Sequence, residues 1–216
     1  MVTGNFRTCV HSAYVRYPLT PRRAYHMAMP LPLTYTEWTA DMLDLLPNDG
    51  NRYEIVDGEL FVTPAPAIIH QRASVELVLL LAPYGKSIGI DVYTAPTDVE
   101  FAPRRVVQPD VLALPRTADG RHAERFADVG VLLLAVEVLS PYSKTRDLFL
   151  KRELYQQERV PDYWIVDCDE RVFIHWTPER QKPEIIRDIL RWQPMAAHPP
   201  LIIDVMQYFR DVLLTD

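Results

Sequence analysis

The segment that most restricts the fold of this chain is an apolar run with one carboxylate inside it, Val131-Leu-Leu-Leu-Ala-Val-Glu-Val-Leu139. The run is short, rich in strand-forming residues and apolar on both faces, which predicts a strand at the centre of a covered sheet. Glu137 interrupts this run, and a carboxylate there is costly unless it is paired, hydrogen-bonded or metal-bound. The alternative is that Glu137 lies at the strand end, exposed or in a salt bridge.

A second apolar segment, Val106-Val-Gln-Pro-Asp-Val-Leu-Ala-Leu114, repeats the pattern with Asp110 as its lone carboxylate. A helix is expected over residues 145–158, ending before Val160-Pro161, and it carries Lys151. Two carboxylates on neighbouring strands and a lysine on the next helix favour a metal-dependent phosphodiester hydrolase. Asp110, Glu137 and Lys151 are therefore the first candidates for a catalytic site.

The order of the remaining elements indicates an α/β domain with helices that flank a central β-sheet. The sheet is expected to be mixed, which makes the domain α+β-like. Asp57-Gly58 is a hairpin signal between two alternating runs over 53–62. A core helix is expected over 68–82, from the helical spacing of Ile69, Ala73, Leu77, Leu80 and Leu81. The other expected elements are helices over about 37–46 and 204–214 and strands over about 89–94, 97–102, 105–114, 162–167 and 172–176.

Charge and cysteine content limit the class of protein. Residues 1–28 hold four arginines and no acid, so the rest of the chain has 19 basic and 29 acidic side chains, a net charge of −10. This balance argues against nucleic-acid binding through many Lys and Arg contacts with phosphates, so a DNA substrate would require a local basic patch, metal ions or a partner. The two cysteines, Cys9 and Cys168, suggest neither a disulfide framework nor a zinc site, which favours the reducing cytoplasm. No apolar stretch reaches the roughly 18 residues that cross a membrane.

Residues 1–28 are expected to be a flexible N-terminal extension to a single domain over 29–216. They lack clear periodicity and a secretory apolar core. Met27 and Met29 precede the first segment with a structured pattern. One hypothesis is therefore that the true start of the protein, or at least of its ordered domain, lies near these methionines.

Six motifs, taken in order, resemble the Uma-two family, mostly bacterial proteins called restriction endonucleases, within the PD-(D/E)XK nuclease superfamily. The motifs are Tyr53-Glu-Ile-Val-Asp-Gly-Glu-Leu60, His70-Gln71, Gln108-Pro-Asp110, Glu137-Val-Leu-Ser-Pro141, Lys151-x-x-x-Tyr155 and Val160-Pro-Asp-Tyr-Trp-Ile-Val-Asp167. The resemblance covers roughly residues 30–200 and implies a restriction-endonuclease-like core.

The resemblance also implies a metal site. Asp110 and Glu137 would bind Mg²⁺, with Mn²⁺ as a substitute, helped by the backbone carbonyl of Val138, and hard oxygen ligands suit this ion. The superfamily lysine usually lies two residues after the glutamate, where this chain has Leu139. In the resembled family the lysine has moved to the following helix, at Lys151.

Five further residues are candidates with open alternatives. Glu54 would be a third acidic ligand or a partner of Lys151, or else a solvent-facing strand residue. His70 and Gln71 open the core helix, where contact with an anionic substrate competes with helix capping. The alternative for Lys151 is a solvated surface lysine paired with Asp147. Lys144, on the loop after the strand that carries Glu137, is a second candidate for the lysine. Glu76, the fifth, lies on the core helix and would face either the site or, as expected, solvent. His175, on a late strand, is not a candidate and is expected to be solvated.

Two classes of function follow. The first is a Mg²⁺-dependent endonuclease that hydrolyses DNA phosphodiester bonds, with Lys151 orienting the attacking water or stabilising the transition-state charge. The alternative is a catalytically inactive nuclease fold used for protein or nucleic-acid binding, which the acidic composition favours. A hydrolase for another phosphoester, such as a nucleotide or RNA, is a more remote option. A homodimer would fit a nuclease that cuts two strands with two subunits.

Overall fold

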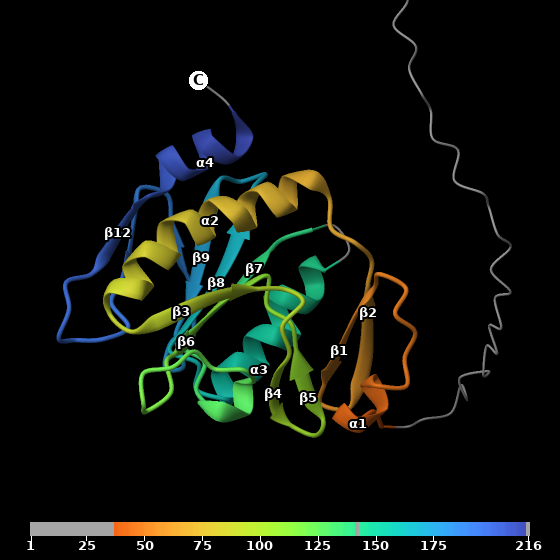
Figure 1. Ribbon diagram of the computed structural model, residues 1–216. Coiled ribbons are helices and arrows are strands. Elements are labelled where there is room, and N and C mark those ends of the chain that lie inside the picture. The colour runs from red at the N-terminus through yellow and green to blue at the C-terminus, as the bar shows by residue number, and fades with distance from the viewer. Residues whose placement is uncertain (1–36, 141–142, 215–216) are drawn as a thin grey trace, which may run out of the picture. The chain divides into compact units, whose positions relative to one another are not determined.

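The computed structural model describes residues 37–140 and 143–214. At their centre is a six-stranded sheet with the spatial order β10-β9-β8-β7-β6-β3 (Figure 1). Its strands are β3 (Ile90–Thr94), β6 (Val111–Pro115), β7 (Leu134–Val138), β8 (Asp162–Asp167), β9 (Val172–Trp176) and β10 (Glu184–Ile186). The strands β7 and β8 pair in parallel, and the other neighbours pair antiparallel. This is the predicted mixed sheet, and β7 lies inside it with all five residues buried.

A second sheet of four antiparallel strands has the order β2-β1-β5-β4. Its strands are β1 (Arg52–Val56), β2 (Glu59–Thr63), β4 (Val99–Ala102) and β5 (Arg105–Val107). The predicted hairpin is β1–β2, and both turn residues have positive φ, 51° at Asp57 and 87° at Gly58. A Cβ at Gly58 would meet only the flexible side chain of Arg104, which can move aside, so it is the positive φ that favours glycine at this turn. A separate pair joins β11 (Ile189–Trp192) and β12 (Leu201–Asp204).

Helices cover both faces of the six-stranded sheet. On one face, α2 (Ile68–Ser87) and α4 (Val205–Leu213) share a core with Val111, Val136 and Trp164. On the other face, α3 (Arg152–Gln157) shares a core with Leu112, Ala135 and Ile165, and a π-helical turn, η2 (Arg146–Lys151), leads into it. Two short helices complete the set, α1 (Ala40–Leu43) and the 3₁₀ turn η1 (Phe126–Asp128). Within the described residues, no helix is both long and apolar enough to cross a bilayer.

The alternation of side chains along β7 decides which face receives its carboxylate. Leu134, Val136 and Val138 belong to the core beneath α2, whereas Ala135 belongs to the core beneath α3. Because successive strand residues point to opposite faces, Glu137 points with Ala135 toward η2 and α3. The strand is therefore apolar on both faces, as predicted, except where it meets the segment that carries Lys151.

The predicted strand over 105–114 is two strands in two different sheets. β5 pairs with β1 and β4, whereas β6 pairs with β3 and β7. The break falls at Gln108-Pro109-Asp110, where proline cannot donate to a strand ladder. Asp110 consequently lies where the chain passes from one sheet to the other, immediately before β6.

Other predicted bounds require correction. The helix expected over 37–46 is α1, which covers only four residues and is followed by turns before Pro47. The helix expected over 68–82 extends to Ser87 and runs through Pro83. Ile69 and Leu80 of its expected core face are 43% and 38% exposed, because the buried face runs instead through residues such as His70, Ser74 and Gly85. The expected boundary between residues 28 and 29 lies outside the described residues.

Candidate active site

Lys151 is fully buried between two carboxylates from different sheets. Its Nζ lies 2.7 Å from Oε1 of Glu54, on β1, and 2.7 Å from Oε1 of Glu137, on β7. The exposed fraction of each of the three side chains is 2% or less. This excludes the alternatives of a solvated Lys151 and a solvent-facing Glu54, and Glu54 is a partner of Lys151, one of the roles expected for it. A lysine held in this way joins the two sheets and η2 at one point.

Asp110 lies beside this cluster, and three groups contact its carboxylate. Arg52 donates to Oδ1 over 2.6 Å, and the backbone N–H of Val138 donates to Oδ2 over 2.8 Å. Nε2 of His70, in the first turn of α2, lies 2.9 Å from Oδ2. His70 therefore contacts the candidate carboxylate and does not cap its helix, whose N-terminal cap residue is Ala67.

The π-helical turn η2 determines which side chains accompany Lys151. Its buried residues are Arg146, Asp147 and Lys151, whereas Phe149 is 59% exposed. Oδ1 of Asp147 lies 4.0 Å from Nζ of Lys151, and Oε2 of Glu54 lies 3.7 Å from Nη2 of Arg146. Segments with π-helical geometry are rare and often occur at functional sites. The helix predicted over 145–158 is therefore α-helical only in its second half, and its first half presents three charged groups inward.

The cluster carries more negative than positive charge. Glu54, Asp110, Glu137 and Asp147 face three permanent cations, which are Arg52, Arg146 and Lys151. Burial raises the pKa of Glu137 well above its ordinary value, and Asp110, Asp147 and Glu54 raise it further, although Lys151 opposes them. Burial would also raise the pKa of Asp110, but His70, Arg52 and the N–H of Val138 lower it to about 2. Asp110 is therefore ionised, whereas the excess negative charge of the cluster favours the protonated form of Glu137.

Lys151 remains protonated in this setting. Burial by itself would lower the pKa of its ammonium group, but Glu137, Glu54 and Asp147 raise it above the value of a free lysine. Tyr155, one helical turn later, donates its hydroxyl hydrogen to Oε1 of Glu137 over 3.2 Å. The side chain of Lys151 can thus act as a fixed positive charge, and Tyr155 helps to hold Glu137 in place.

The remaining predicted residues lie at different distances from this centre. Gln71 is exposed on α2 and lines a cavity next to Asp110. Glu76 is only partly buried and pairs with Arg72 on its own helix, over 2.7 Å. Lys144 is exposed near the end of β7 and makes no contact with either candidate carboxylate. His175, expected to be solvated, is instead buried on β9, with Nε2 2.7 Å from Oδ1 of Asp162.

Sequence reasoning missed Arg52 and Arg146. A usable signal existed for Arg52, because the period of two along β1 places it on the same face as Glu54. No comparable signal existed for Arg146, because its inward direction depends on the π-helical turn and a helix of regular period was expected there.

The donor set suits a hard divalent cation at Asp110 and Glu137. A carboxylate offers about four acceptor positions, and Asp110 uses three of them. Oε2 of Glu137 accepts no hydrogen bond from the described residues, while Oε1 accepts two. No group of three or more His, Cys, Asp and Glu side chains in the described part of the chain is arranged to hold a metal. A cation would therefore have two carboxylate ligands and fill its other positions from the backbone and water, as Mg²⁺ commonly does.

The mixed sheet and its flanking helices form a fold that is also found in a solved structure. A similar fold occurs in the crystal structure of "a putative nuclease belonging to DUF820" from Anabaena variabilis ATCC 29413, with a TM-score of 0.67 and 17% sequence identity. The match covers 81% of this chain and 98% of the other. The chain belongs to the Uma2 family, described as "Putative restriction endonuclease", whose model matches residues 39–207. The resemblance expected from the six motifs is thus confirmed. A search of curated proteins gives no match to this chain.

Proposed function

We propose that this protein is a metal-dependent endonuclease that hydrolyses DNA phosphodiester bonds with Asp110, Glu137 and Lys151. The observation that carries the proposal is the fully buried ammonium group of Lys151, held 2.7 Å from Glu137 on a strand next to the one that Asp110 precedes. Burying three charged groups is costly, and a purely structural role would be served as well by apolar side chains. Membership of the Uma2 family supports the same activity.

The proposed mechanism assigns a separate task to each side chain. Mg²⁺ bound at Asp110 and Glu137 would supply Lewis acidity to the phosphoryl oxygen and lower the pKa of the attacking water. Lys151 provides a positive charge that does not need to reorganise, so it orients the water or stabilises the charge of the transition state. Because its pKa is raised, Lys151 acts as a cation and not as a general base. Glu54 is a positioning residue, because it holds the ammonium group from the side opposite Glu137.

Cleavage assays test the proposal. Supercoiled and single-stranded DNA are incubated with Mg²⁺, Mn²⁺ or EDTA and with wild type, Asp110→Asn, Glu137→Gln or Lys151→Met protein. We expect metal-dependent cutting that falls at least about 100-fold in each variant, the usual effect of removing a transition-state stabiliser. Lys86→Met, which changes an exposed lysine near the end of α2, is the matched control. Wild-type rates in folded Asp110→Asn protein would refute the assignment, and loss of cutting in Lys144→Met would transfer the role of the lysine to that residue.

A second function has one observation in its favour. The carboxylate of Asp110 already has three partners within the protein, and both partners of Oδ2 are buried. A site so well satisfied also suits a nuclease fold that binds a protein or nucleic acid without catalysis. Metal binding separates the two functions. If the site is catalytic, calorimetry should show that wild type binds Mn²⁺ and that Asp110→Asn and Glu137→Gln do not. A binding module should show the same Mn²⁺ affinity, or the same lack of binding, in wild type and in both variants.

A further inference from the structure

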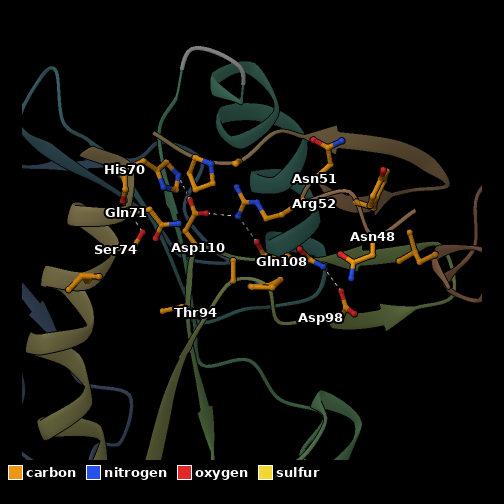
Figure 2. Close-up of a pocket in the computed structure, with 18 of the residues that line it drawn as sticks. Asn48, Asn51, Arg52, His70, Gln71, Ser74, Thr94, Asp98, Gln108 and Asp110 are labelled. Carbon is orange, nitrogen blue, oxygen red and sulfur yellow. Dashed lines mark hydrogen bonds and ion pairs between the residues drawn. The ribbon is translucent and has the colours of Figure 1, made fainter. Parts of the chain in front are cut away.

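A cavity of about 480 Å³ opens directly beside Asp110. Its wall includes Gln71 and His70 from α2, Asn48 and Asn51 from the segment before β1, and Thr94 at the end of β3. Figure 2 shows the α2 side chains on one side of this hollow and the asparagines on the other, with Asp110 between them. The volume lies in the range of roughly 300–1,000 Å³ that is typical of small-ligand sites. The cavity is thus large enough for one planar ring system next to the candidate catalytic carboxylate.

Neutral amide side chains give this cavity its chemical character. Four of them line it, namely Asn48, Asn51, Gln71 and Gln108. Among the described residues, the side-chain amides of Asn48 and Gln71 have no hydrogen-bond partner. Nε2 of Gln108 donates to Asp98 over 2.8 Å, while its Oε1 is buried without a partner. Each amide offers a donor and an acceptor side by side, so the cavity can bind a ligand with the same paired arrangement.

The charges of the cavity argue against an anionic ligand inside it. The acids in its wall are Asp44, Asp98 and Asp110. Its one permanent cation in the described wall is Arg52, which is already bound to Asp110 over 2.6 Å. A phosphate placed there would face net negative charge, whereas a neutral ring with donors and acceptors at its edge would not. Tyr53 adds an aromatic ring to the wall, a group on which bases commonly stack.

We infer that this cavity binds one unpaired nucleobase of a DNA strand whose phosphate lies outside the cavity, at the proposed metal site of Asp110 and Glu137, an inference that rests on the proposed nuclease function. Asparagine and glutamine pair with adenine through two hydrogen bonds, which makes adenine the base of choice. A concave site cannot read a base that is stacked and paired in a duplex, so the base must be unpaired or turned out of the helix. Recognition by neutral amide side chains also explains how an acidic protein binds a nucleic acid, because recognition of a base does not require a basic surface.

Binding tests the inference without requiring cleavage. A fluorescein-labelled single strand of deoxyadenosine and a strand of equal length that lacks bases are titrated with protein at constant salt and in EDTA, and fluorescence anisotropy is measured. The proteins are wild type, Asn48→Ala, Gln71→Ala and Gln181→Ala. Gln181 is the matched control, because it is an exposed amide before β10 that does not line the cavity. Free deoxyadenosine monophosphate is titrated as a competitor to distinguish a strand from a mononucleotide as the source of the base.

We expect the strand with bases to bind at least about tenfold more tightly than the strand without them. This difference should shrink about tenfold in Gln71→Ala or Asn48→Ala and persist in Gln181→Ala. Both strands binding alike, or neither binding, would overturn the base site, as would an unchanged preference in the two cavity variants. Competition by the mononucleotide at the strand's own affinity would overturn the strand as ligand. If the base site fails while cutting still depends on Asp110, the nuclease function stands; base-specific binding without any cutting refutes only the nuclease function.

Discussion

Removing the charge of Lys151 should cost far more stability than removing the charge of Glu137. Lys151→Met keeps a side chain of similar size but leaves Glu54 and Glu137 buried opposite each other without their shared cation. Breaking a buried pair by removing one partner costs about 3–5 kcal/mol, because an uncompensated charge remains in the interior. In a chain of this length each kcal/mol lowers the melting temperature by about 2–4 °C, so Lys151→Met should melt on the order of 10 °C below wild type.

Glu137→Gln should leave the stability unchanged or raise it. The amide oxygen of glutamine can still accept the hydrogen bonds from Lys151 and Tyr155 that Oε1 of Glu137 accepts. Burial and three neighbouring carboxylates raise the pKa of Glu137, so ionising it in the folded protein costs free energy that the neutral amide avoids. The double variant Glu137→Gln/Lys151→Met should recover part of the stability lost in Lys151→Met, because one of the two unpaired carboxylates is gone.

The assay is thermal unfolding followed by circular dichroism in EDTA, near neutral pH. Lys86→Met, the exposed lysine variant, should stay within about 0.5 kcal/mol of wild type. The reasoning fails if Lys151→Met has the same melting temperature as the wild-type protein, since Lys151 would then be solvated. It also fails if Glu137→Gln unfolds the protein, because the charge of Glu137 would then be required for folding and not for a site.

Three other predictions follow from the structure. The pKa of Asp110 is about 2 in the folded protein, below the ordinary aspartate value of 3.8, so its carboxylate contributes on the order of 2 kcal/mol of stability that is present above about pH 4 and is lost as the pH falls toward 2. Urea unfolding midpoints measured across this range should fall less in Asp110→Asn than in wild type, and an equal fall in the two proteins would contradict the prediction. Burial, together with Asp167 and Asp169, raises the pKa of the Cys168 thiol to about 11. Iodoacetamide should therefore label this cysteine in Cys9→Ser protein on the order of 100-fold more slowly than a free thiol near pH 8, with a rate that rises about tenfold per pH unit. Labelling at the rate of a free cysteine would count against burial. Gly85→Ala should destabilise the protein by about 1–3 kcal/mol, because the new Cβ would lie 2.9 Å from the carbonyl oxygen of Ile90. The loss is expected even though alanine is the better helix former by about 1 kcal/mol. A melting temperature above that of wild type would show instead that the helix relaxes away from β3.

Several features of the fold could be predicted from local patterns. The run around Glu137 predicted the buried central strand, because a strand covered on both faces must be apolar on both faces. The hairpin turn at Asp57-Gly58 was predictable because few residue pairs adopt positive φ at both positions. The prediction of one strand over 105–114 was wrong, because local pattern does not reveal that consecutive strands belong to different sheets.

By itself, the sequence determined the mixed α/β fold, the family and the two carboxylates that interrupt apolar segments. Those conclusions depend on the cost of burying charge and on periodicity, which are local properties of the chain. Only the tertiary structure decided the partners of these carboxylates. Arg52, Arg146 and Glu54 meet the central cluster because two sheets and a π-helical turn converge there, over separations of up to about a hundred residues that no local pattern encodes. The same convergence leaves the amide-lined cavity beside Asp110, since packing of distant segments, and not any motif, sets the space between them.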